Sequence, residues 1–298
     1  MIDQTRREFL RHSLCAGAMS MGASRLRAAF AEDAGKPGSK MKFGLVTYLW
    51  GKDWDLPTLI SNCEQSGVLG VELRTTHKHG VERELTAAQR AQVKKRFDDS
   101  PVTNVGIGSA ECFDHVSPEA LAKAIEATKE FVKLSRDTGG SGVKVRPNTF
   151  HKEVPREQTI EQIGKSLNVV GAFGADYGQQ IRLEVHGDGS PPPIMKQIID
   201  IADHPNVGLC WNSNGQDLQG EGFEHNFNLL KARFGATCHV RPLNTPGYPW
   251  DQLLKLFVER DYPGWLLLEA GGAPADPIAA LIEQRRLFEE LCAKAQAA

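Results

Sequence analysis

The feature that most constrains the fold is a regular alternation of short apolar runs with longer amphipathic segments, starting near residue 42. The apolar runs have the length of β-strands, and the segments between them carry helix-start signals such as Ser117-Pro118-Glu119. Eight strand–helix units without a break in composition predict a single (β/α)8 TIM barrel over residues 41–298. The eight expected strands are residues 42–48, 70–74, 103–110, 142–148, 181–187, 207–212, 236–242 and 264–270.

The alternative fold for such a pattern is a doubly wound open sheet. That fold is expected to carry a glycine-rich phosphate loop directly after its first strand. Here the first strand runs into "TYLWGKDWD" (residues 47–55), which contains a single glycine. The sequence therefore favours the barrel.

The first 31 residues have the features of a twin-arginine-type signal peptide. Paired arginines occur in "TRREFLR" (residues 5–11), an apolar stretch follows over residues 14–23, and an A-x-A cleavage pattern ends at Ala31. We therefore expect an exported, periplasmic protein that is a client of the twin-arginine translocation machinery. The apolar stretch is too short to span a bilayer and no lipobox precedes Cys15, so we expect no membrane anchor.

Composition narrows the classes of partner. After residue 31 the chain has 30 basic and 35 acidic residues. This small excess of negative charge does not favour binding of nucleic acid. Residues 32–40 ("EDAGKPGSK") are polar and rich in Gly and Pro, which predicts a flexible linker. Scattered cysteines inside apolar runs favour buried free thiols over a disulfide framework. They are Cys63, Cys112, Cys210, Cys238 and Cys292.

Polar side chains collect at the carboxyl ends of the predicted strands, where (β/α)8 barrels carry their chemistry. Because side chains alternate along a strand, every second residue lies on the same face, and the residues on the inward face can be followed to the barrel mouth. This alternation selects Glu72, Arg74, Lys144, Arg146, Asn148, Arg182, Glu184, His186, Asn212, Asn214, His239, Arg241 and Glu269. Buried charges without partners cost several kcal/mol, so this set requires salt-bridge partners or a ligand.

The spacing of four of these residues predicts a metal site. Glu184, Asn212, His239 and Glu269 follow one another at intervals of 28, 27 and 30 residues, which is about one strand–helix unit each. Four consecutive strands would each deliver one ligand to the same mouth. Two carboxylates, an imidazole and an amide oxygen suit one divalent ion such as Mn, Mg, Co or Zn. The alternative is that these groups only form structural salt bridges with Lys144, Arg182 and Arg241.

The same four residues resemble the Glu, Asp, His, Glu metal quartet of the xylose isomerase-like TIM barrels. The matching segments are "RLEVHG", "CWNSN", "CHVRPL" and "LLLEA", and "GVELR" around Glu72 also matches. The family includes sugar epimerases and isomerases, dehydratases and DNA repair endonucleases. This chain has Asn212 where the family usually has Asp. That change removes one negative charge from the expected site, which would weaken metal binding and make a bound metal more electrophilic.

The resemblance implies proton abstraction α to a sugar carbonyl through an enediolate, with Glu184 and Glu269 as the acid/base pair. The expected contacts to substrate oxygens or to the groups around the metal are Lys144, Arg146, Arg182, His186, Asn214, Arg241, Glu72, His77 and Trp50. Because phosphorylated metabolites are scarce outside the cytoplasm, we expect a non-phosphorylated keto-sugar as substrate.

Three functions remain open at this stage. The first is a metal-dependent sugar isomerase or epimerase. The second is a 3-keto-glycoside lyase that uses the same proton abstraction to expel the group at C1. The third is an exported sugar-binding protein without catalysis, for which Asn212 is the best support and the paired glutamates are the best opposition. DNA repair is disfavoured by the acidic body, and the sequence does not determine whether the protein forms a homo-oligomer.

Overall fold

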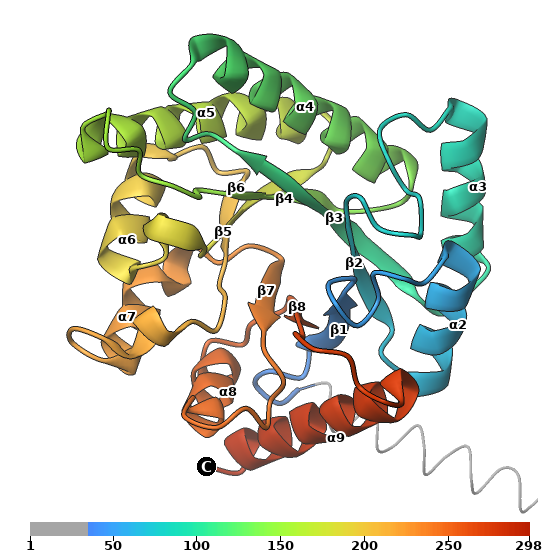
Figure 1. Cartoon of the computed structure of the whole chain (residues 1–298). Helices are drawn as coiled ribbons and strands as arrows, with labels where there is room; N and C mark the ends of the chain where they lie inside the picture. The colour runs from blue at the N-terminus through green and yellow to red at the C-terminus, as the bar shows by residue number, and fades with distance from the viewer. Residues whose placement is uncertain (1–34) are drawn as a thin grey trace, which may run out of the picture.

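Eight parallel strands alternate with helices and confirm the predicted (β/α)8 barrel (Figure 1). The computed structural model describes residues 35–298, so the predicted signal peptide and the first residues of the predicted linker lie outside the described residues. The strands are β1 (Lys42–Val46), β2 (Gly70–Arg74), β3 (Thr103–Cys112), β4 (Gly142–Arg146), β5 (Gln180–Glu184), β6 (Val207–Cys210), β7 (Thr237–Val240) and β8 (Trp265–Leu268).

The strands form one sheet in the order β6-β5-β4-β3-β2-β1-β8-β7, and each neighbouring pair in this order is parallel. Two isolated bridges, Leu209 with Phe234 and Asn212 with His239, join β6 to β7 and bring the open edges together. The second bridge matters for function, because it places two of the expected metal ligands side by side.

The helices form a ring around the strands in Figure 1, with the last helix lying between its neighbours α8 and α2. Their bounds are α2 (Leu56–Ser66), α3 (Ala87–Asp98), α4 (Pro118–Asp137), α5 (Arg156–Asp176), α6 (Pro192–Ile201), α7 (Phe223–Leu230), α8 (Trp250–Glu259) and α9 (Pro277–Gln296). The sequence signal for α4 holds, because the Ser117 hydroxyl accepts a hydrogen bond from the backbone N–H of Ala120 and Pro118 is the first helical residue.

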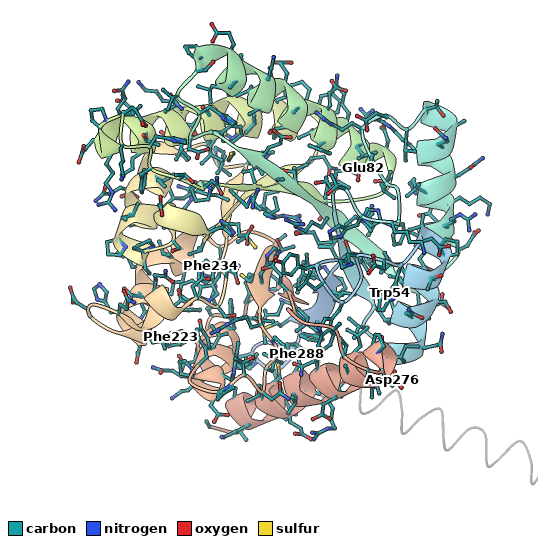
Figure 2. All side chains as sticks on the ribbon, viewed as in Figure 1. Trp54, Glu82, Phe223, Phe234, Asp276 and Phe288 are labelled. Carbon is teal, nitrogen blue, oxygen red and sulfur yellow. The ribbon has the colours of Figure 1, made fainter. Side chains whose placement is uncertain are left out.

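The apolar core lies between the strands and the surrounding helices. Figure 2 shows Phe223 and Phe234 on the side covered by α7, where both rings contact the fully buried Trp211. At the bottom of the view, Phe288 of α9 stacks on Phe43 of β1 with ring centroids 5.1 Å apart. These contacts fix the strands from outside and leave the barrel interior to a small apolar cluster and a set of buried polar groups.

Arg182 occupies a different part of the barrel from the one we expected. Its guanidinium donates to the Ser141 hydroxyl (2.7 Å) and to the Val105 carbonyl (3.3 Å), so it does not reach the mouth. Gly106 and Gly142 leave room for this side chain, because a Cβ on either residue would lie 3.2 Å or less from the guanidinium. Of the two contacts expected for Arg182, a substrate oxygen is not within its reach, because strand parity gives the face of a residue but not its depth, whereas its charge does help to lower the pKa of Glu72.

The end of the predicted linker packs against the barrel. Gly38 is buried against Val258, its N–H donates to Asp261 (2.8 Å), and the Pro37 carbonyl accepts from Gln296 (3.1 Å). These contacts hold the residues around Gly38 against the barrel. No helix in the described part of the chain combines the length and the apolar character needed to cross a bilayer.

Candidate metal centre at the barrel mouth

Four successive strands bring the expected metal ligands to the same end of the barrel. Glu184 is the last residue of β5, Asn212 follows β6 by two residues, His239 lies in β7, and Glu269 directly follows β8. Glu184 and His239 are fully buried, whereas the Glu269 side chain is 18% exposed. The cluster is therefore closed on the barrel side and open to solvent at Glu269.

The distances fit a divalent cation. His239 Nδ1 lies 3.7 Å from Glu184 Oε1 and 3.7 Å from Glu269 Oε2. Within residues 35–298 this buried nitrogen has no hydrogen-bond partner. Two ligands about 2.1 Å from one ion lie about 3.0 Å apart in octahedral geometry and about 3.4 Å apart in tetrahedral geometry. The two observed distances from His239 Nδ1 exceed these values by about 0.3–0.7 Å, and the three ligand atoms all lie within 4.8 Å of one another.

Glu72 lies behind His239 instead of facing substrate, where we expected it. Its Oε1 is 3.1 Å from His239 Nε2, and both side chains are fully buried. A carboxylate on the second ring nitrogen is the arrangement that orients metal-binding histidines and turns the other nitrogen toward the ion. Burial alone would raise the pKa of Glu72, but His239, Lys144 and Arg182 outweigh burial and lower it. Glu72 is therefore a charged group that positions His239.

The pKa of His239 depends on the same group of buried residues. Burial alone would lower the pKa of His239, but Cys210, Glu72 and Glu184 outweigh burial and raise it well above its ordinary value. The protonated imidazole and the Lys144 ammonium then offset the charge of the buried carboxylates. A divalent cation bound to Nδ1 would displace that proton, so binding is expected to weaken as pH falls.

Asn212 lies between the two glutamates with its nitrogen toward them. Its Nδ2 donates to Glu184 Oε1 (3.0 Å) and to Glu269 Oε2 (3.3 Å), the same two oxygens that face His239. An amide presents an acceptor after rotation by half a turn, so Asn212 would ligate a cation through Oδ1 only in that second orientation. In the orientation seen here, the residue holds the two carboxylates together.

Lys144 makes the two glutamates chemically different. Its Nζ lies 2.7 Å from Glu184 Oε2, and both side chains are almost completely buried. Burial would raise the pKa of Glu184, but Lys144 and His239 outweigh it and hold the pKa well below its usual range. Burial would lower the pKa of Lys144, but Glu184, Glu72 and Glu269 raise it overall. Lys144 therefore contacts a proposed metal ligand.

Three of the expected substrate contacts hold buried nitrogen atoms without a hydrogen-bond partner anywhere in the described chain: Arg146 Nε, His186 Nδ1 and Arg241 Nε. The Arg146 guanidinium also donates to the Ala110 carbonyl (3.0 Å), and Arg241 lies over the Tyr248 ring at 5.3 Å. Burial lowers the pKa of His186. These nitrogens lie at or just after the carboxyl ends of β4, β5 and β7, and their lack of protein partners leaves them free to pair with a polar ligand.

The other three expected contacts already have protein partners. Asn214 Nδ2 donates to the Val185 carbonyl (2.7 Å), and Trp50 Nε1 donates to the Gly271 carbonyl (3.0 Å). The His77 ring lies 3.4 Å from both Arg74 Nη1 and Thr47 Oγ1. Their hydrogen bonds connect the loops that follow β1, β2, β5, β6 and β8, so these residues shape the mouth.

Sequence reasoning missed a buried pair beside the mouth. Asp217 accepts hydrogen bonds from the Tyr248 hydroxyl (2.6 Å) and the Asn214 N–H (2.8 Å), and burial raises its pKa to about 7. Asp217 follows the end of β6 by seven residues and lies in a 3-10 turn (Gly215–Leu218), so strand parity could not select it. The available signal was an aspartate soon after two strand-end asparagines.

Asp217 is expected to make stability fall as pH rises. The folded protein holds this proton more tightly than the unfolded chain, whose Asp pKa is about 3.9. Its contribution is therefore full below pH ~4 and is lost as pH rises to about 7, by at most about 4 kcal/mol. Urea unfolding of the wild type and of Asp217→Asn across this range measures the difference. Equal pH slopes for the two proteins would contradict the raised pKa.

Comparison with known families decides the identity of the barrel. A model of the xylose isomerase-like TIM barrel family matches residues 60–291. The chain belongs to this family. The matched segment of this xylose isomerase-like barrel contains Glu72, Glu184, Asn212, His239 and Glu269. No curated protein matches the chain in sequence.

Solved structures show the same fold at low sequence identity. An L-ribulose 3-epimerase has 15% identity and a TM-score of 0.72, with 86% of this chain and 96% of that chain covered. A 3-keto-D-glucoside 4-epimerase from E. coli has 13% identity and a TM-score of 0.69, with 84% and 99% covered. An IolI protein with a bound zinc atom has 16% identity and a TM-score of 0.68, with 85% and 99% covered. At these identities the likeness establishes the fold alone.

Proposed function

We propose that this protein is a divalent-metal-dependent isomerase or epimerase of a non-phosphorylated keto-sugar. The observation that carries the proposal is the convergence of Glu184 Oε1 and Glu269 Oε2 on the buried Nδ1 of His239, each at 3.7 Å. The family and the two epimerases of similar fold support a sugar as substrate. A binding protein without catalysis has no need for two carboxylates directed at one point.

Glu184, His239 and Glu269 would hold the cation, with Asn212 as a fourth ligand after rotation of its amide. The ion would be Mn, Mg, Co or Zn, and when bound it polarises the sugar carbonyl and stabilises developing negative charge. Arg146, His186 and Arg241 bind and orient the sugar through their unpaired nitrogens. The burial of the cluster excludes water from all but the Glu269 side.

The structure favours different roles for the two glutamates. Both oxygens of Glu184 already face positive or donating groups, Lys144 at 2.7 Å and Asn212 at 3.0 Å. Glu269 is more exposed, and its Oε2 accepts the longer hydrogen bond from Asn212. We therefore assign Glu269 as the base that removes the proton α to the carbonyl. Glu184 with Lys144 returns a proton at the neighbouring position or on the other face.

A 3-keto-glycoside lyase is the second candidate, and the Lys144–Glu184 pair is the observation that favours it. The Lys144 ammonium lies 2.7 Å from Glu184, so a protonated donor stands beside one of the two acid/base groups. If the substrate carries a leaving group at C1, removal of the C2 proton and protonation of that group would expel it. In this step the base keeps the proton from C2, and the acid donates a proton to the departing C1 group.

Export is part of the same proposal. We propose that residues 1–31 are a twin-arginine signal, that the translocation machinery is a partner, and that the mature protein is periplasmic. Supply of free sugars instead of sugar phosphates in that compartment supports a non-phosphorylated substrate.

Proton NMR in heavy water tests the activity. Metal-loaded protein is incubated with a panel of free ketoses and 3-keto-glycosides. Deuterium at the carbon next to the carbonyl, with the skeleton intact, indicates an isomerase or epimerase, whereas loss of the C1 substituent indicates a lyase. Binding of a panel member without exchange of any proton would support the binding-protein alternative and overturn catalysis.

Restoring the family carboxylate with Asn212→Asp is expected to tighten Mn²⁺ binding at least about tenfold, or ~1.4 kcal/mol. The substitution adds a negative charge and an oxygen ligand at a position now occupied by a hydrogen-bond donor. Calorimetric titration of chelator-treated protein measures the effect. Asn228→Asp adds the same charge on the exposed surface of α7 and serves as the matched control. Equal affinities in both variants would show that Asn212 does not lie at the ion.

A further inference from the structure

A second group of metal-binding side chains lies at the end of β3. Cys112 is the last residue of that strand, and Asp114 and His115 follow before α4 begins. Each offers one ligand atom, and the three atoms all lie within 4.8 Å of one another. The distance from Cys112 Sγ to His115 Nε2 is 3.9 Å. None of these residues belongs to the cluster at the barrel mouth.

The Asp114 carboxylate gives an independent indication that this cluster binds a cation. Asp114 is 4% exposed, and its Oδ2 accepts a hydrogen bond from the Thr149 N–H (2.9 Å). Its Oδ1 is buried and accepts no hydrogen bond from any described residue. A buried acceptor left unpaired costs about 1–3 kcal/mol, and more when it is charged. A cation beside Oδ1 would remove that cost.

The loop that carries these groups is held in place by other elements. Gln162 of α5 donates from Nε2 to the Phe113 carbonyl (2.8 Å) and to the His115 carbonyl (2.9 Å). Arg146 donates to the Ala110 carbonyl (3.0 Å), two residues before Cys112, the last residue of β3. Because the backbone on both sides of Asp114 is anchored, the three side chains do not need to be gathered from a mobile segment.

A further imidazole lies beside the cluster. His151, from the loop after β4, has its Nε2 3.5 Å from Asp114 Oδ2, and its side chain is 36% exposed. It offers an additional nitrogen ligand from another loop. With it, the donor set is one sulfur, one carboxylate and two imidazoles.

We propose that Cys112, Asp114 and His115 form a zinc-binding site at the end of β3, with His151 as the adjacent fourth ligand. Ligands about 2.3 Å (sulfur) and about 2.05 Å (nitrogen) from a tetrahedral zinc ion lie about 3.6 Å apart. The observed 3.9 Å requires a movement of a few tenths of an ångström. A thiolate with imidazoles selects zinc over magnesium, calcium or manganese, which prefer oxygen ligands.

Zinc at this site joins two loops of the barrel. Cys112, Asp114 and His115 belong to the connection between β3 and α4, and His151 belongs to the connection between β4 and α5. Cys112 is also in register with Arg146, the last residue of β4 and a proposed substrate contact. The ion therefore acts as a structural clamp that fixes the loops beside Arg146.

The test uses Co²⁺ as a spectroscopic probe in the full folded chain. The double variant Glu184→Gln/Glu269→Gln neutralises two of the proposed metal ligands at the barrel mouth, so that cobalt is not expected to bind there. We expect this protein to bind one equivalent of Co²⁺ with an intense sulfur-to-cobalt charge-transfer band, which stoichiometric Zn²⁺ abolishes. Adding Cys112→Ser is expected to remove the band. Cys292→Ser, which removes another partly buried free thiol on α9, is the matched control and keeps it.

The outcomes separate this site from the proposed activity. A band that is absent, or that survives Cys112→Ser, overturns the zinc site, whatever the fate of the sugar reaction. If the double variant does not fold, the wild type with its mouth filled by Mn²⁺ replaces it, because manganese gives no such band. Protection of Cys112 from a thiol reagent by Zn²⁺, absent in His115→Gln, is the second readout. Equal reactivity with and without Zn²⁺ would also refute the proposal.

Discussion

Glu269→Gln is expected to reduce the rate of solvent-deuterium exchange into the sugar by at least about 10²- to 10⁴-fold, the range of general acid/base catalysis. Glutamine keeps the shape of the side chain but cannot accept the proton. Because the amide still presents an oxygen, we expect the variant to keep substrate binding, so kcat falls more than KM changes. The measurement is NMR exchange under saturating Mn²⁺, together with a binding titration of the same sugar.

Glu184→Gln is expected to reduce the rate of solvent-deuterium exchange by a similar factor, and it is also expected to lower the affinity for the metal. Glu184 contacts Lys144 and Asn212 and faces His239, so neutralising it leaves the buried ammonium without its closest partner. Glu259→Gln removes an exposed carboxylate on α8 and is the control that should change neither property. Exchange at the wild-type rate in both Glu184→Gln and Glu269→Gln would rule out the proposed acid/base pair.

Lys144→Met is expected to lower the free energy of unfolding by about 3–5 kcal/mol, because it leaves a buried carboxylate without its compensating charge. In the wild type the depressed pKa of Glu184 means that its stabilising contribution is present above pH ~4.3, the unfolded value, and is lost as pH falls through its folded pKa. Without Lys144, burial dominates and raises that pKa. The variant should therefore become less stable as pH rises, the reverse of the wild-type contribution.

Two further proteins isolate the cause. Lys144→Met/Glu184→Gln removes both charges and is expected to recover most of the lost stability. Lys196→Met breaks a surface ion pair with Asp200 and is expected to cost about 1 kcal/mol or less. Urea unfolding of the four proteins at several pH values gives the comparison. A double variant as unstable as Lys144→Met would show that the lysine acts through packing of its stem instead of through the ion pair.

The fold could be predicted from the sequence because hydrophobic residues recur with a different period in strands and in helices. The predicted strands begin within one residue of the observed ones, but several were extended too far at the carboxyl end. The first was predicted to residue 48 and ends at Val46, and the fifth was predicted to residue 187 and ends at Glu184. Strand pairing therefore stops at the mouth before the residues at which the sequence pattern predicted the strands to end. Asn212 and Glu269 lie in that short interval, whereas Glu184 and His239 lie within the observed strands.

The candidate site was predictable in part for a similar reason. The spacing of Glu184, Asn212, His239 and Glu269 placed them at the ends of successive strands, and the structure brings them together. Parity could not tell that Arg182 lies lower in the barrel, in space left by glycines from other strands. It also could not pair Glu72 with His239, residues separated by 167 positions.

The sequence by itself determined the eight strand–helix units and the polar character of the strand ends, because hydrophobic period and chain connectivity are local properties. The tertiary structure alone decided how those polar groups share charge: Lys144 with Glu184, Glu72 with His239, and Asn212 between two carboxylates. It also brought Asp114 beside His151. Partner choice depends on depth and rotamer inside a closed barrel, and these are set only when all eight strands meet.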